Sequence, residues 1–216
     1  MSANSANIQL NRRSFLALSC GLLLDFAFGK DLSPKTHPQK RNLFVYYTRT
    51  LNTHILANYM QGLIGGDLLQ IHTAQSYPKD YQQAVALASK QRIRGILPPL
   101  LPYSLDLTRY DNVIIAAPLW DMDLCVPIKS FLSALNLGDK RVYFIITNAG
   151  FGLGDSVKSV KKFVKAQNLA GILDYKFKDY EKVVPNLLAL NQAKIAQNKA
   201  FDTLDKAKIA KFVAQI

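Results

Sequence analysis

Apolar runs of strand length alternate with amphipathic helical segments along most of this chain. Residues 43–47 form an unbroken apolar and aromatic run, which predicts a buried strand, and residues 68–71 predict a second one. Between them, residues 52–63 carry apolar side chains at helical spacing. Such alternation is typical of a parallel sheet that is covered by helices on both faces.

The same alternation continues toward the C-terminus. Strands are predicted at residues 112–117 and 141–146, and helices at 81–91, 127–135, 156–167 and 205–216. Three prolines in residues 97–107 predict a loop there. The fifth strand has two candidates, residues 171–177 and residues 183–190, and the pattern alone does not separate them.

A hydroxyl-rich turn joins the first predicted strand to the first helix. Successive backbone N–H groups of such a turn, with the positive end of the helix dipole, form a concavity that holds a phosphate. The turn adds the side-chain donors Thr48, Thr50, Asn52 and Thr53. The alternative is a plain connecting loop, in which Thr50 or Thr53 only caps the helix.

Two more loops follow the strands predicted at 112–117 and 141–146. All three loops therefore lie at the carboxyl edge of the sheet, where open parallel sheets bind ligands. The second loop carries Trp120, either as a ring that stacks on a flat heterocycle or as a core aromatic. The third loop contains Gly150, Gly152 and Gly154, whose backbone N–H groups can approach a ligand closely.

Together the three loops resemble those of the flavodoxin family, over about residues 43–163. The segment Tyr77-Pro78-Lys79-Asp80-Tyr81, after the second strand, matches a motif of a bacterial branch of that family outright. The resemblance implies an α/β fold, a flavodoxin-like three-layer α/β/α sandwich with a five-stranded parallel sheet in the order 2-1-3-4-5. It also implies that the cofactor is noncovalently bound FMN.

The resemblance further implies a cofactor site shared by the three loops. The first loop would hold the phosphate, Trp120 would cover one face of the isoalloxazine, and Thr147 with the amides of Ala149 and Gly150 would line its polar edge. The implied FMN-binding residues are Thr48, Arg49, Thr50, Leu51, Asn52, Thr53, Pro118, Leu119, Trp120, Asp121, Met122, Thr147, Asn148, Ala149, Gly150 and Gly152. No side chain is assigned a catalytic role, and no metal site is expected.

The chain departs from the family pattern at Cys125 and Ala149, where the family commonly has a proline and a glycine, and at two further positions. Leu51 replaces the glycine of the phosphate loop, and a leucine held in a left-handed conformation costs about 1 to 2 kcal/mol. Met122 stands where the family often has a glycine beside the flavin. The departures at Leu51 and Met122 favour an alternative function, a flavin-free flavodoxin-like module that binds a partner protein or a membrane surface.

Paired arginines, Arg12 and Arg13, precede a moderately apolar run that ends near Phe28. This pattern resembles a twin-arginine export signal and predicts a signal peptide at residues 1–29, a polar tether at 30–42 and the flavodoxin-like domain at 43–216. The alternative is an accidental arginine pair before a buried helix. Twin-arginine systems carry folded proteins, so this signal fits a protein that binds its cofactor before export to the periplasm.

The chain of 216 residues has a formal net charge of +12, which permits contact with an anionic membrane surface or an acidic partner. Nucleic acid is disfavoured, because the lysines are dispersed and no known binding module accompanies them. We therefore predict an exported FMN protein, which passes electrons to a redox partner protein or reduces a small-molecule acceptor such as a quinone. The sequence leaves open whether it is an enzyme, and which oligomer it forms.

Overall fold

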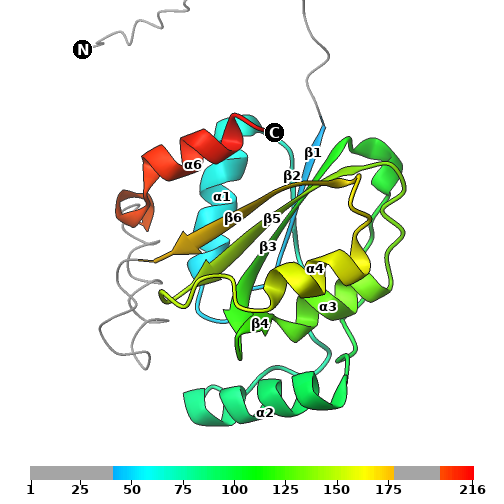
Figure 1. Cartoon of the computed structure of the whole chain (residues 1–216), viewed down its shortest axis with the longest axis vertical. Helices are drawn as coiled ribbons and strands as arrows, with labels where there is room; N and C mark the ends of the chain where they lie inside the picture. Colours follow the sequence, from blue (N-terminus) through cyan, green and yellow to red (C-terminus); the bar gives the residue numbers. More distant parts are fainter. Residues whose placement is uncertain (1–40, 178–199) are drawn as a thin grey trace, which may run out of the picture. The chain divides into compact units, whose positions relative to one another are not determined.

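The computed structural model describes residues 41–177 and 200–216. In this part of the chain, five strands run parallel in the spatial order β2-β1-β3-β5-β6, and β4 pairs antiparallel with β3 (Figure 1). The strands are β1 (Asn42–Tyr46), β2 (Asp67–Gln70), β3 (Asn112–Trp120), β4 (Asp123–Leu124), β5 (Arg141–Asn148) and β6 (Leu169–Lys176). Counted along the chain without β4, the parallel strands follow the predicted flavodoxin-like order 2-1-3-4-5.

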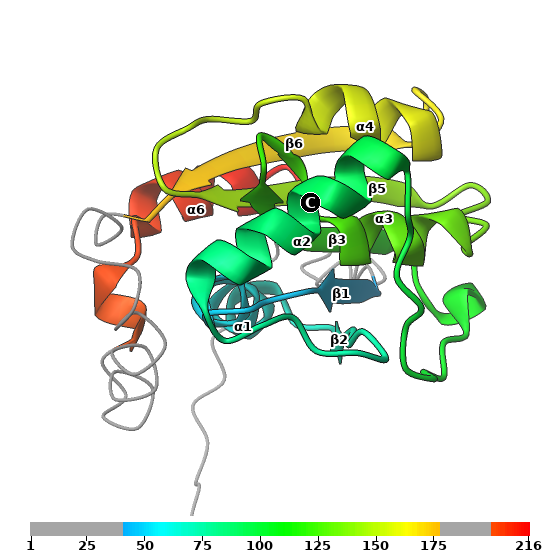
Figure 2. The ribbon, with the colours of Figure 1, turned by 90° about the horizontal axis from the view of Figure 1, so that it is seen from below.

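Helices pack on both faces of the sheet, as the alternating pattern predicts. One face is covered by α1 (Asn52–Ile64) and α6 (Lys206–Val213), and the other by α3 (Val126–Ser133) and α4 (Ser156–Phe163) (Figure 1). The remaining long helix, α2 (Tyr81–Arg94), lies beyond the carboxyl end of β3 (Figures 1 and 2). Two short 3-10 helices complete the described elements, η1 (Leu107–Arg109) and η4 (Ala200–Thr203).

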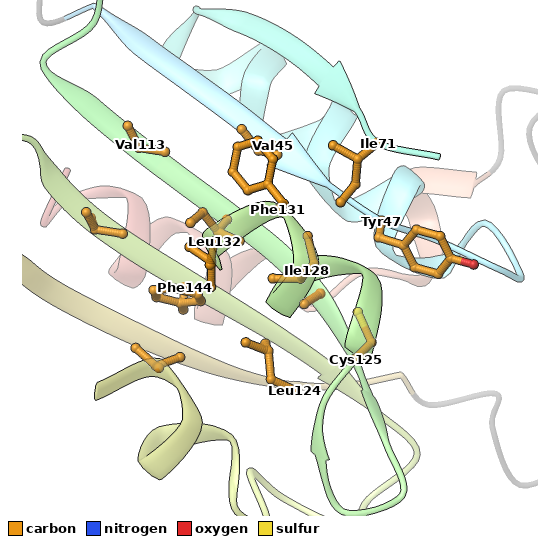
Figure 3. Packing of buried hydrophobic residues seen from close by; sticks show 14 of the residues in the cluster. Val45, Tyr47, Ile71, Val113, Leu124, Cys125, Ile128, Phe131, Leu132 and Phe144 are labelled. Carbon is orange, nitrogen blue, oxygen red and sulfur yellow. The ribbon is translucent and has the colours of Figure 1, made fainter. Parts of the chain in front are cut away.

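The core consists of two apolar layers, one on each side of the sheet. Along β1 the side chains alternate, so that Val45 joins the layer beneath α3 and α4, whereas Phe44 joins the layer beneath α1 and α6. Figure 3 shows the first layer, in which Phe131 of α3 lies among strand side chains such as Val113 and Phe144. Because both faces are covered, the central strands read as continuous apolar runs.

Most predicted elements are confirmed, with small shifts at their ends. β1 begins at Asn42, inside the predicted tether, because the Asn42 side chain is buried and donates to the Ile64 carbonyl at 3.2 Å. The helix predicted at 156–167 ends at Phe163, since Val164 is extended and buried in the core. None of the described helices is both long and apolar enough to cross a membrane.

Several predictions fall on residues outside the described ranges. The fifth strand of the parallel sheet is β6 (Leu169–Lys176), which corresponds to the first of the two candidates, and the second candidate at 183–190 lies outside the described residues. The predicted signal peptide at 1–29 and the tether residues up to 40 also lie outside them. These assignments stay predictions.

Candidate functional site

A pocket of about 250 Å³ opens at the carboxyl edge of the parallel sheet, where the three predicted loops come together. Its walls come from the β1–α1 turn, the β3–β4 hairpin, the start of the β5–α4 loop and one face of α2. The lining residues are Thr48, Arg49, Thr50, Asn52, Thr53, Tyr81, Ala84, Val85, Ala88, Pro118, Leu119, Trp120, Asp121, Met122, Thr147, Asn148, Ala149 and Phe151.

The β1–α1 turn leaves the N-terminus of α1 without a side-chain cap. Leu51 occupies the N-cap position in a left-handed conformation, with φ 66°, and the helix has no acidic residue in its first turn. The N-cap position therefore belongs to Leu51 and not to Thr50 or Thr53. The left-handed backbone expected from the glycine of the family pattern is present, and it costs a leucine about 1 to 2 kcal/mol. An uncapped, acid-free helix start is favourable for an anion.

One of the predicted donors is engaged beneath the pocket. The hydroxyls of Thr53 in α1 and Thr147 in β5 lie 2.8 Å apart and form a buried hydrogen bond. Thr147 also lies 3.4 Å from the carbonyl oxygen of Ala117. The two threonines thus tie the first and third loops together across the end of the sheet.

Arg49 links the β1–α1 turn to the segment that precedes α2. Its guanidinium donates to the carbonyl of Lys79 at 3.3 Å and lies 5.8 Å from the centre of the Tyr81 ring. A cation over an aromatic face is attracted by the ring quadrupole. These contacts hold the Arg49 guanidinium at the polar end of the pocket.

The Tyr-Pro-Lys-Asp-Tyr motif has a structural explanation in the start of α2. The buried Tyr77 donates to Gln91 at 2.5 Å, and Asp80 caps α2 by accepting from the backbone of Gln83 at 2.8 Å. Tyr81 then lines the pocket. Three side chains of the motif thus have separate roles: Tyr77 anchors the segment to α2, Asp80 caps the helix, and Tyr81 faces the pocket.

The second predicted loop is largely a hairpin, and Trp120 lies in its first strand rather than in the turn. Trp120 pairs with Asp123 across β3 and β4, and the tip is Asp121 and Met122, with φ 49° and φ 60°. Two successive positive φ angles are what a tight two-residue hairpin turn of type I′ requires. The Trp120 ring lines the pocket and also makes an edge contact with Tyr77 at 4.8 Å between centroids.

Contacts from both sides hold the hairpin tip. Asp121 pairs with Arg92 of α2 at 2.5 Å. The Met122 carbonyl accepts the backbone N–H of Asp155 at 2.7 Å. A Cβ added at Gly154, which has φ 49°, would lie 2.2 Å from the same carbonyl oxygen, so only glycine permits this approach. The tip is thus fixed between α2 and the start of α4.

The third loop contributes less to the pocket than predicted. The Asn148 side chain donates to Asp174 of β6 at 2.6 Å and accepts the N–H of Gly150 at 2.8 Å. The Gly150 amide is therefore committed to Asn148 rather than to the polar edge of a ligand. Within the described residues, Gly150 and Gly152 do not line the pocket, and neither does Leu51.

The other predicted site residues all line the pocket, together with five residues that were not predicted from the sequence. Tyr81, Ala84, Val85 and Ala88 belong to α2, and Phe151 follows the Gly150 turn. Of these five, Tyr81 could have been predicted, because it is the last residue of the Tyr-Pro-Lys-Asp-Tyr motif. Ala84 and Ala88 are the buried residues of α2 and share one helical face.

Burial governs the ionisable groups around the pocket floor. It raises the pKa of Tyr47 and of Tyr77, so both phenols stay neutral. It also raises the pKa of the Cys125 thiol to about 12, which excludes a reactive thiolate at neutral pH. Tyr47 and Tyr77 support the pocket from behind, since both rings make edge contacts with Trp120.

No model of a protein family matches the chain, and no curated protein matches its sequence. Solved structures do match it. A flavoprotein from Lactobacillus acidophilus NCFM in complex with FMN has a TM-score of 0.56 and 22% identity, over 62% of this chain and 92% of that chain. A candidate flavoprotein from Bacteroides eggerthii DSM 20697 has a TM-score of 0.58 and 23% identity, over 71% of this chain and 97% of that chain.

Structural matches at 22% and 23% identity show the fold of the chain. The matches cover more than nine tenths of both solved structures, and the strand order of this chain is the one typical of a flavodoxin-like sheet. The chain has a flavodoxin-like α/β/α fold.

Proposed function

We propose that the pocket binds FMN noncovalently and that the protein is an electron-transfer flavoprotein, with a redox partner protein or a small molecule such as a quinone as acceptor. The observation that carries the proposal is the pocket itself, which joins an anion-binding helix start to an aromatic and apolar wall at the carboxyl edge of a flavodoxin-like sheet. One matched structure is a flavoprotein in complex with FMN.

The polar end of the pocket fits the phosphate of FMN. Thr48 and Thr50 offer hydroxyl donors, Arg49 offers a guanidinium, and the uncapped start of α1 offers backbone N–H groups. The acidic side chain that lines the pocket, Asp121, is paired with Arg92. A dianionic group therefore meets donors and positive charge at this end.

The rest of the pocket fits a flat ring system. Trp120 and Leu119 line one side, and the small side chains of Ala84 and Ala88 leave room along α2. Ring stacking and apolar contact would hold the isoalloxazine, while α2 would shield it from water. Bound FMN supplies the redox chemistry, and these side chains bind, orient and shield it.

Comparing FMN with riboflavin tests the proposal, because the two ligands differ by the phosphate. Arg49→Gln should weaken FMN binding about 10-fold or more and leave riboflavin binding nearly unchanged, as expected for a lost charge-assisted contact. Arg109→Gln is the matched control, since Arg109 is exposed at the opposite edge of the sheet, in η1. Quenching of flavin fluorescence during titration measures both affinities.

Two outcomes would count against the proposal. If neither flavin binds to purified protein, the flavin-free binding module becomes the better assignment. If Arg49→Gln weakens FMN and riboflavin equally, the first loop does not hold the phosphate.

The same proposal includes export to the periplasm through the twin-arginine pathway, supported by Arg12 and Arg13 before an apolar run. Replacing both with lysine keeps the charge but removes the guanidinium pair. The precursor should then stay in the cytoplasm, which cell fractionation and immunoblotting would measure. Periplasmic accumulation at the level of the unmodified protein would contradict export by this route.

A further inference from the structure

The hairpin tip at Asp121 and Met122 lies between two helices that carry only basic charges. The last turn of α2 reaches it through the Arg92–Asp121 pair, and α4 begins beside it through the Asp155–Met122 hydrogen bond. The sequences of α2 (Tyr81–Arg94) and α4 (Ser156–Phe163) contain no aspartate or glutamate.

The two helices that flank the tip carry five exposed basic side chains, which we call the basic rim: Lys90 and Arg94 at the end of α2, and Lys158, Lys161 and Lys162 along α4. In the described part of the chain, none of them takes part in an ion pair. Asp155, at the start of α4, is an exposed carboxylate, but its single negative charge is smaller than the five positive charges of the basic rim. The rim therefore carries a net positive charge that the described residues do not neutralise.

Exposed apolar side chains lie at the mouth of the pocket, which the hairpin tip borders. Phe151 is 67% exposed and Met122 is 48% exposed, and both line the pocket. Val85 and Tyr81 of α2 continue the apolar surface. An apolar centre with a charged periphery is the usual anatomy of a protein–protein interface.

We propose that the basic rim and its apolar centre dock an acidic electron-transfer protein over the mouth of the pocket. The complementary charge steers the partner and sets its orientation, and the apolar centre makes the close contact. The physiological meaning rests on the proposed flavoprotein function, because a partner docked there faces the ligand in the pocket.

The burial of α4 favours a protein over a lipid surface as the occupant. A helix that lies in a membrane interface inserts its apolar face among the lipids. In α4 that face is used inside the fold, since Val160 is 0% exposed and packs in the core. What α4 presents outward is its lysines, which suit charge pairing with acidic side chains.

Binding to a plant-type [2Fe–2S] ferredoxin, an acidic one-electron carrier, tests the proposal on the full chain. The test variant is Lys158→Gln/Lys161→Gln/Lys162→Gln. The control is Lys206→Gln/Lys208→Gln/Lys211→Gln, which removes the same charge from α6 on the opposite face of the sheet. Fluorescence anisotropy of labelled ferredoxin gives the affinity, with FMN present and absent, at low and high salt.

The α4 variant should bind ferredoxin about 10-fold more weakly, as expected when a few exposed charge pairs are lost, and the α6 control should bind within 2-fold of the unmodified protein. High salt should weaken the unmodified protein and remove the difference. With FMN bound, electron transfer from reduced ferredoxin should slow in the α4 variant, while reduction by a small neutral reductant should not change.

Equal weakening in both variants would overturn the proposal, since it would show diffuse charge and no defined face. So would the absence of ferredoxin binding, including a case in which phosphatidylglycerol vesicles bind through α4 instead. Specific binding by protein that takes up no FMN would leave the docking face standing and would reject only the flavoprotein function.

Discussion

The hydrogen bond between Thr53 and Thr147 joins two parts of the site that are 94 residues apart in the sequence, and it allows a quantitative test. Thr53 is 1% exposed and Thr147 is 3% exposed, so water cannot replace a lost partner. Valine has nearly the same shape as threonine and removes only the hydroxyl. The two single variants and the double variant form a thermodynamic cycle.

The two single variants should differ in cost. After Thr147→Val, the Thr53 hydroxyl is buried without the partner it has in the native fold, and the free energy of unfolding should fall by about 1 to 3 kcal/mol. After Thr53→Val, Thr147 still has the Ala117 carbonyl at 3.4 Å, so the loss should be about 1 kcal/mol. The double variant removes both hydroxyls and should lose about 1 kcal/mol less than the sum of the two.

Urea unfolding, followed by far-ultraviolet circular dichroism, gives the free energies. A control cycle pairs Thr147→Val with Thr108→Val, because Thr108 lies in η1 at the other edge of the sheet and bonds Asp106. Those two changes should add within about 0.5 kcal/mol. Additive losses for Thr53→Val and Thr147→Val would refute the reasoning, since they would mean that the two hydroxyls do not stabilise each other.

Three other predictions concern single residues. Leu51→Gly should give a protein about 1 kcal/mol more stable to urea than Leu51→Ala, because glycine adopts φ 66° without strain. This gain should exceed the cost of the greater entropy that glycine gives the unfolded chain. A glycine variant less stable than the alanine variant would show that the backbone at this position is not strained. In a Cys20→Ser background, Cys125, whose pKa burial raises to about 12, should react with a disulfide reagent at the rate of unfolding; reaction at the rate of a free thiol would show that it is accessible. Burial lowers the pKa of His54 from 6.5, so as the pH falls the unfolded chain binds a proton at this residue before the folded protein does. The free energy of unfolding should therefore be at its full value above pH 6.5 and decline below it, and it should decline less in His54→Gln. Urea unfolding at several pH values measures this, and parallel profiles for the two proteins would contradict it.

The alternation of strands and helices was predictable because it follows from burial along the chain. A central strand such as β3 is covered on both faces, so its sequence is continuously apolar, whereas an amphipathic helix such as α6 carries one apolar stripe. These periods are local properties of the sequence. They predicted the first four parallel strands, whereas the strand order came from the resemblance to the flavodoxin family.

The hairpin of β3 and β4 was missed because its turn residues are unusual. Asp-Gly and Asn-Gly are the pairs that signal a tight hairpin, and here the tip is Asp121 and Met122. The conformation is supported from outside the hairpin, by Arg92 on one side and by the close approach of Gly154 on the other. A turn whose conformation depends on residues far along the chain cannot be recognised from its own sequence.

The place of α2 was also not predictable. Its sequence indicates a helix, but only Ala84 and Ala88 are buried, and so small an apolar face does not tell which surface it covers. Arg49 and Arg92 bring it over the pocket by contacts with the first and second loops.

The sequence alone therefore determines the fold class and the three loops that form the site, because hydrophobic periodicity and turn composition depend only on residues that are close together in the sequence. Which groups within the loops face a ligand depends on partners far along the chain. Thr53 bonds Thr147, and the Gly150 amide is taken by Asn148, whose side chain Asp174 holds from the next strand. A buried polar group must find a partner wherever the packing offers one, so these contacts emerge only when the strands and helices are assembled.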